Sequence, residues 1–124
     1  MKTFTDSRGT IYDFENGTHV ITCKAGSKRA NHYHKTSSHR SILTRGSLDY
    51  YEKPTNSLQK PIKQNIVAPA IFDTDCLIDH LMHFQEDSEF VCLRINGSDT
   101  PEEYEKDVVR LNYDMQEVYD NWKE

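Results

Sequence analysis

The histidine-rich stretch 26–46 constrains the fold of this chain more than any other part of the sequence. His32 and His34 are separated by one residue, so on a β-strand both imidazole rings leave the same face while Tyr33 points the other way. Two convergent imidazoles supply half of a metal site. We therefore expect a β-structure in which these two rings share one face.

A second strand is expected to bring a third ring to this pair. Residues 35–38, Lys-Thr-Ser-Ser, are polar and turn-prone, so they predict a reversal of the chain. A strand that begins at His39 and ends at Gly46 would then lie beside the first one. This arrangement predicts that the rings of His32, His34 and His39 converge.

The spacing of the stretch resembles the first motif of the cupin superfamily. That motif runs glycine, five residues, His-x-His, three or four residues, Glu, six residues and glycine. Its places fall on Gly26, His32, His34, position 39 and Gly46, and His39 stands where the family usually has Glu. The resemblance implies an all-β fold, the double-stranded β-helix of the cupin jelly roll.

Length and composition are those of one small domain. The 124 residues are enough for one hydrophobic core, and 35% hydrophobic with 28% charged residues predicts a slim one. The net charge of −5 and the lack of a basic block argue against nucleic acid and anionic membrane surfaces as partners. No stretch is apolar enough for a membrane span.

Three scattered cysteines, Cys23, Cys76 and Cys92, are odd in number and form no Cys-x-x-Cys pair. This pattern favours free thiols over a disulfide framework. We therefore expect a cytoplasmic protein.

The rest of the first 97 residues is typical of short strands separated by turns, and we expect residues 1–97 to form the barrel. Turn signals stand at 6–9 and 15–17. The expected strands are 10–14, 18–24, a strand from His39 towards Gly46, 47–53, an alternating run from Ile62 to Ile66, 77–85 and 89–95.

Leu77–Gln85 carries a further candidate ligand. His80, Met82 and Phe84 share one strand face. At the second cupin motif only this histidine matches, so the resemblance, which runs from Gly26 to Ile95, rests mainly on its first half. It implies that His80 is a fourth ligand.

Residues 98–124 are expected to form a C-terminal tail. Thr100–Glu103 has the features of a helix start, and 108–111 favours a strand. From Asn112 to Glu124 a terminal helix is predicted, with an apolar stripe that must be buried against the barrel or a second subunit. The stripe consists of Met115, Val118, Tyr119 and Trp122.

The histidine cluster predicts a divalent transition metal. His32, His34, His39 and His80 would supply neutral nitrogen ligands, which suit Zn, Fe, Ni, Co or Cu. With His39 in place of the family's Glu, a bound ion keeps its full positive charge, so an anionic ligand is favoured. The two other histidines, His19 and His83, fit no such spacing and are assigned to the surface or to packing.

A second resemblance leads to a different chemistry. Residues 29–35, Arg-Ala-Asn-His-Tyr-His-Lys, and 6–9, Asp-Ser-Arg-Gly, look like the cupins that isomerise thymidine-diphosphate ketosugars. The resemblance implies that His32 and His34 act as general acid and base without a metal. Those enzymes usually have Gln at position 39 and need no ligand at position 80.

Three functions therefore stay open. The first is a metal-dependent enzyme, a dioxygenase or isomerase, acting on a small polar or anionic molecule. The others are a metal-free nucleotide-sugar isomerase or epimerase and a non-catalytic cupin that binds a small ligand such as a sugar. In each case a small-molecule partner and a homodimer are expected, with a pocket lined by Tyr33, Tyr50, Met82 and Phe84.

Overall fold

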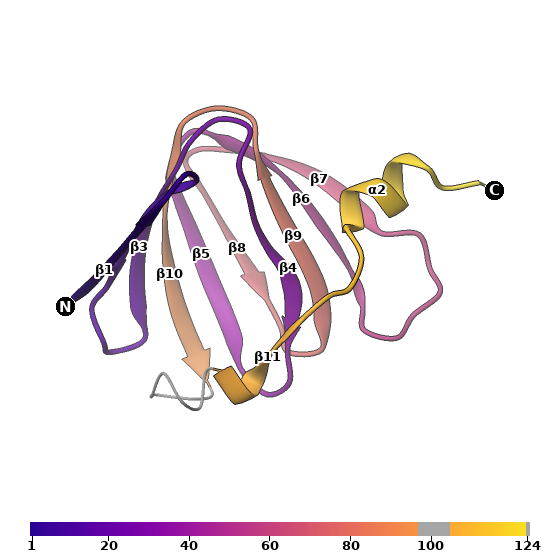
Figure 1. Ribbon diagram of the computed structural model, residues 1–124, viewed down its shortest axis with the longest axis horizontal. Helices are drawn as coiled ribbons and strands as arrows, with labels where there is room; N and C mark the ends of the chain where they lie inside the picture. Colours follow the sequence, from indigo (N-terminus) through magenta and orange to yellow (C-terminus); the bar gives the residue numbers. More distant parts are fainter. Residues whose placement is uncertain (97–104, 124) are drawn as a thin grey trace.

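The computed structural model of the chain describes residues 1–96 and 105–123. Its strands are β1 (Lys2–Asp6), β2 (Gly9–Asp13), β3 (Thr18–Cys23), β4 (Lys28–His34), β5 (Ser38–Arg45), β6 (Ser47–Pro54), β7 (Ile62–Val67), β8 (Ala70–Thr74), β9 (Ile78–Phe84), β10 (Ser88–Asn96) and β11 (Val108–Arg110), followed by helix α2 (Met115–Asp120). Two antiparallel sheets face each other (Figure 1). Six strands form the first sheet, in the order β1-β2-β3-β10-β5-β8, and five form the second, in the order β11-β4-β9-β6-β7.

Strong alternation of apolar and polar residues located most strands correctly, but β1 and β8 were not predicted. All five residues of β1 are exposed, so this edge strand has no buried face and no apolar pattern to read. Strand β8 is only five residues long and begins directly after Pro69, a residue type that interrupts strand patterns. Both strands lie at sheet edges, where burial imposes the weakest pattern.

The core lies between the sheets and is filled from their inner faces. Leu43 and Phe90 enter from the six-stranded sheet, and Leu48 and Phe84 enter from the five-stranded sheet. The rings of Phe84 and Phe90 stack with centroids 5.8 Å apart. The histidines lie towards one end of the sandwich, at the end of β4 and near the beginnings of β5 and β9.

The C-terminal tail covers the outer face of the five-stranded sheet. Residues 105–107 are helical, and β11 then pairs with β4. Beyond it, α2 lies beside the five-stranded sheet (Figure 1), and its Met115 is fully buried against Tyr51 and Leu81 of that sheet. The tail therefore extends the sheet with one strand and shields its apolar outer surface.

The terminal helix is shorter than the predicted 112–124. Asp114 is its N-cap, because its carboxylate accepts hydrogen bonds from the backbone N–H groups of Gln116 and Glu117, and Asn121 ends it. Trp122, the last residue of the predicted stripe, lies beyond the helix and is partly exposed. The predicted helix start at 100–103 lies outside the described residues. Among the helices that the structure describes, none has the length and apolar character needed to cross a membrane.

Candidate metal centre

Two neighbouring strands of the five-stranded sheet position the proposed ligands. His32 on β4 lies directly opposite His80 on β9. His34 follows two residues later on β4, so its ring leaves the same face, as predicted. The side chains converge between the sheets because this face is the inner one.

A bulge in β4 sets the direction of His32. The register of β4 against β9 shifts between Ala30 and His32, and both Ala30 (φ 72°) and Asn31 (φ 59°) have left-handed backbone conformations. One extra residue reverses the alternation of the strand, so Arg29 and His32 both reach the inner face although they are three residues apart. The Asn31 side chain donates to the Tyr113 carbonyl (2.6 Å) and accepts from the Met115 N–H (3.2 Å). The tail therefore holds the bulge in place.

The structure brings together three of the four predicted ligands. One ligand atom each from His32, His34 and His80 lies within 4.8 Å of the others. The ring centroids are 4.8 Å apart for His32 and His34, and 4.7 Å apart for His32 and His80. Such a compact set of imidazoles suits a borderline divalent ion.

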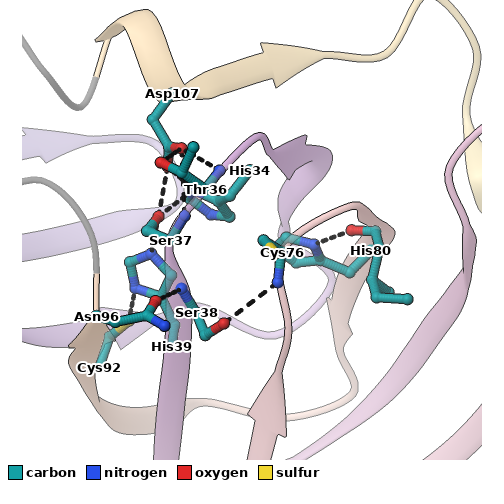
Figure 2. A network of polar contacts seen from close by, with 11 residues as sticks. His34, Thr36, Ser37, Ser38, His39, Cys76, His80, Cys92, Asn96 and Asp107 are labelled. Atoms are coloured by element: carbon teal, nitrogen blue, oxygen red, sulfur yellow. Dashed lines mark hydrogen bonds and ion pairs between the residues drawn. The ribbon is translucent and has the colours of Figure 1, made fainter.

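In two of these rings Nδ1 donates a hydrogen bond, and this leaves Nε2 as the atom that can bind an ion. The Nδ1 of His80 lies 2.9 Å from the carbonyl oxygen of Ile78, which can only accept, so Nδ1 carries the proton. The Nδ1 of His34 lies 3.0 Å from the Asp107 carboxylate, which fixes the same tautomer (Figure 2). In both residues the lone pair of Nε2 is left for a ligand bond, the usual arrangement around metal-binding histidines.

Burial keeps the rings neutral. Desolvation, together with the nearby rings of His80 and His34, lowers the pKa of His32 to about 2. The pKa of His80 is lowered to about 4, again mainly by burial. Because a metal ligand must be deprotonated, these histidines lose no proton on binding an ion at neutral pH.

Asp107 contacts the histidine cluster, and the sequence pattern did not indicate it. Its buried carboxylate accepts hydrogen bonds from His34, from the Thr36 N–H (2.7 Å) and hydroxyl (2.8 Å), and from the Ser37 hydroxyl (Figure 2). Burial alone would raise its pKa, but the donors of Ser37, Thr36 and His34 together hold the pKa well below its usual value. A residue 70 or more positions from its partners leaves no local sequence signal.

His39 lies next to the cluster but outside the group of three. It comes from β5 in the opposite sheet, and its ring centroid is 4.3 Å from that of His34. Its Nε2 lies 3.1 Å from the Ser37 hydroxyl and its Nδ1 lies 3.5 Å from the Cys92 sulfur. Burial, with the neighbouring His34 and His80, lowers its pKa to about 3. The strand after the turn thus brings a third ring beside His34, as predicted, but it comes from the opposite sheet and does not pair with β4, and its histidine contacts Ser37 and Cys92.

The four residues predicted to line a pocket do not lie together. Tyr50, Met82 and Phe84 are on the inner face, where Tyr50 and Phe84 belong to the packed core and Met82 contacts it. The Tyr50 hydroxyl lies 2.5 Å from the Thr74 hydroxyl. Tyr33 is on the outer face of β4, where it lines a cavity of about 380 Å³ beneath the tail. Alternation along β4 separates Tyr33 from the two histidines on either side of it.

The two remaining histidines lie outside the group of three formed by His32, His34 and His80. His19 forms a contact of 3.4 Å with Asp13 at its Nε2, and His83 lies on the face of β9 opposite to His80.

Comparison with solved structures identifies the fold. The capsular polysaccharide assembling protein CapF of Staphylococcus aureus matches 89% of this chain with a TM-score of 0.76 at 18% identity, and the match covers 31% of CapF. The CENP-C cupin domain of Drosophila melanogaster matches 75% of the chain and 74% of its own length, with a TM-score of 0.63 at 10% identity. A single-site variant of oxalate decarboxylase from B. subtilis matches 89% of the chain and 30% of its own, with a TM-score of 0.67 at 14% identity.

The fold is the cupin jelly roll, as the motif resemblance implied. The chain spans about a third of the length of CapF and of oxalate decarboxylase. No protein-family model and no curated protein matches the sequence. Fold and site together define a cupin-fold protein with a three-histidine cluster positioned for a metal ion.

Proposed function

We propose that this protein is a metal-dependent cupin enzyme, of the dioxygenase or isomerase type, that acts on a small polar or anionic molecule. The observation that carries the proposal is the convergence of His32, His34 and His80 with their ligand atoms within 4.8 Å of one another. When bound, a divalent ion supplies a Lewis acid that polarises an oxygen of the substrate. The chain itself holds the rings neutral and oriented, through burial, Asp107 and the Ile78 carbonyl.

The charge of the interior supports an anionic or polar substrate. Three neutral imidazoles leave the charge of a bound ion uncompensated. Arg29 is buried as well, and its guanidinium donates to the Cys23 sulfur (3.2 Å) and the Thr22 carbonyl (3.4 Å), both of which are uncharged groups. The three cysteines are free, which favours a reducing compartment such as the cytoplasm.

A second candidate is acid/base catalysis by His32 and His34 without a metal, on a nucleotide sugar. The contact between His34 and Asp107 favours it, because a carboxylate that orients an imidazole is the usual partner of a general base. CapF is named for the assembly of a capsular polysaccharide, and sugar chemistry fits this candidate. The third candidate, a non-catalytic protein that binds a sugar, would use the same space between the two sheets.

Metal content tests the first proposal. Protein purified without an affinity tag should contain about one equivalent of a transition metal by elemental analysis, and zinc should raise the melting temperature of chelator-treated protein. His80→Ala should abolish both effects because it removes a ligand. His83→Ala is the matched control, since it removes a histidine from the opposite face of the same strand.

The same assay separates the candidates. If His83→Ala and His80→Ala behave alike, or if zinc leaves the melting temperature unchanged, the three-histidine metal site is rejected and acid/base catalysis becomes the better proposal. A fourth-ligand role for His39 is tested by His39→Gln, which restores the residue usual in the sugar isomerases. Loss of zinc affinity supports that role, and an unchanged affinity restricts the site to three histidines.

A further inference from the structure

The outer face of the six-stranded sheet carries an apolar row that no described element covers. In the registers of this sheet, Tyr12 lies opposite Val20, Val20 opposite Val91, Val91 opposite Ile42, and Ile42 opposite Ile71. Residues opposite each other in a sheet point to the same face. The row ends at Tyr12, 36% exposed, and Ile71, 66% exposed.

The two outer faces of the sandwich differ in this respect. On the five-stranded sheet, Tyr51 and Leu81 are buried because Met115 of the tail packs over them. The tail lies on that side of the molecule, and the broad face of β3, β10 and β5 is on the other side (Figure 1). The outer face of a solvent-exposed sheet normally carries polar residues. An apolar row on such a face therefore indicates a surface that binds a partner.

We propose that this row is the centre of a homodimer interface, in which the six-stranded sheets of two copies pack face to face. The row crosses five strands, each of which takes up about 4.8 Å, so it is about 24 Å long. With one flanking row on each side, three rows of about 7 Å each make the face about 21 Å wide, so it measures roughly 500 Å² in projection. That is of the same order as the about 800 Å² of accessible surface that each partner buries in a stable complex.

The charge pattern of the face suits contact with a second copy. The central row carries no charge, so a twofold axis through it brings no like charges together. On one flank, Arg40 is paired with Asp73 at 2.9 and 3.0 Å, which leaves this pair neutral. On the other flank Glu89 lies opposite Arg45, a residue of opposite charge, and the Glu89 carboxylate accepts a hydrogen bond from Thr44 (2.9 Å). The remaining positions are held by threonines and an apolar residue: Thr10, Thr18, Thr22 and Leu93.

The mass of the protein in solution tests this proposal. Sedimentation or light scattering from micromolar to submillimolar concentration should give twice the mass of one chain. Ile71→Lys should weaken the dimer by about a hundredfold, because each dimer loses this apolar contact twice. Ile62→Lys is the matched control: Ile62 is also an edge-strand isoleucine, 63% exposed, but on the other sheet. The control variant should stay dimeric.

Tyr12→Lys, at the opposite end of the row, provides an independent variant should Ile71→Lys fail to fold by circular dichroism. Dissociation of the folded Tyr12→Lys protein supports the interface in the same way. A wild-type protein with the mass of one chain throughout overturns the proposal. So does a dimer that survives both row variants, or one that Ile62→Lys dissociates equally well, because the contact then lies elsewhere.

Discussion

Asp107 combines two tasks at the scale of a single residue. It fixes the tautomer of His34, and it accepts hydrogen bonds from the Thr36 N–H and from the hydroxyls of Thr36 and Ser37, in the turn between β4 and β5. A carboxylate in this position raises the basicity of the imidazole and holds its ring in one orientation. The residue is therefore a positioning residue for the cluster.

Replacing Asp107 by Asn tests that role. The amide keeps the size of the side chain but loses the charge and turns an N–H₂ group towards Thr36 or Ser37, which already donate. Zinc affinity, measured by competition with a chelator, should fall about 10- to 100-fold, the range found for hydrogen-bond partners of metal-binding histidines. Asp114→Asn is the control, because Asp114 is a hydrogen-bonded carboxylate of the same tail that caps α2. An equal loss of affinity in both variants would reduce Asp107 to a general stabiliser of the tail.

Residues with a local pattern could be predicted, and residues without one could not. His32 and His34 are two residues apart, so strand alternation places them on one face, and His80 lies opposite His32 on β9 and shares that face. The bulge at Ala30 and Asn31 has no sequence signature in this chain, because neither residue is glycine although both have positive φ. The tautomer-fixing contact of Asp107 depends on tertiary folding and leaves no trace in the spacing.

At the scale of elements, the tail connects the outside of the barrel to its interior. Leu111 donates its N–H to the Asn31 carbonyl (3.1 Å), and the Asn31 side chain binds Tyr113 and Met115. Asn31 directly precedes His32. Docking of α2 on the outer face therefore supports the strand conformation that directs His32 inward.

Met115 is the residue on which this docking depends. Met115→Ala should lower the free energy of unfolding by about 2–5 kcal/mol, the usual cost of truncating a fully buried side chain. Trp122→Ala, from the exposed end of the predicted stripe, should cost less than about 1 kcal/mol. Urea unfolding of both variants measures the difference. Equal losses would mean that the whole predicted stripe is buried, as in the longer helix expected from the sequence.

Edge elements explain the remaining differences between the predicted and the observed fold. Central strands such as β5 and β10 bury their inner face more deeply than their outer face and therefore alternate, whereas β1 is exposed along its whole length. The terminal helix was overestimated because the spacing of Met115, Val118, Tyr119 and Trp122 continues past Asn121, where the backbone leaves the helix. Apolar periodicity gives the face of an element more reliably than its ends.

For the whole molecule, the buried imidazoles link stability to pH. Burial lowers the pKa of His32 to about 2, of His39 to about 3 and of His80 to about 4, whereas an unfolded histidine titrates near 6.5. Below about pH 6.5 these histidines therefore bind protons in the unfolded chain but stay neutral in the folded protein. The stability supplied by these neutral rings is complete above that pH and is lost as the pH falls towards about 4.

The expected slope is large enough to measure. Each histidine that stays neutral only in the folded state contributes up to about 1.4 kcal/mol per pH unit, so three give at most about 4 kcal/mol per unit. A small domain is stable by about 5–15 kcal/mol, so the metal-free protein should unfold in mild acid. Urea titrations in the presence of a chelator, at intervals from pH 7.5 to pH 5, should show this decline. His39→Gln should flatten it because one titrating ring is gone, while His34, whose pKa burial also lowers, remains. A free energy of unfolding that stays level across this interval would mean that the rings accept protons in the folded state, and hence that water reaches the cluster.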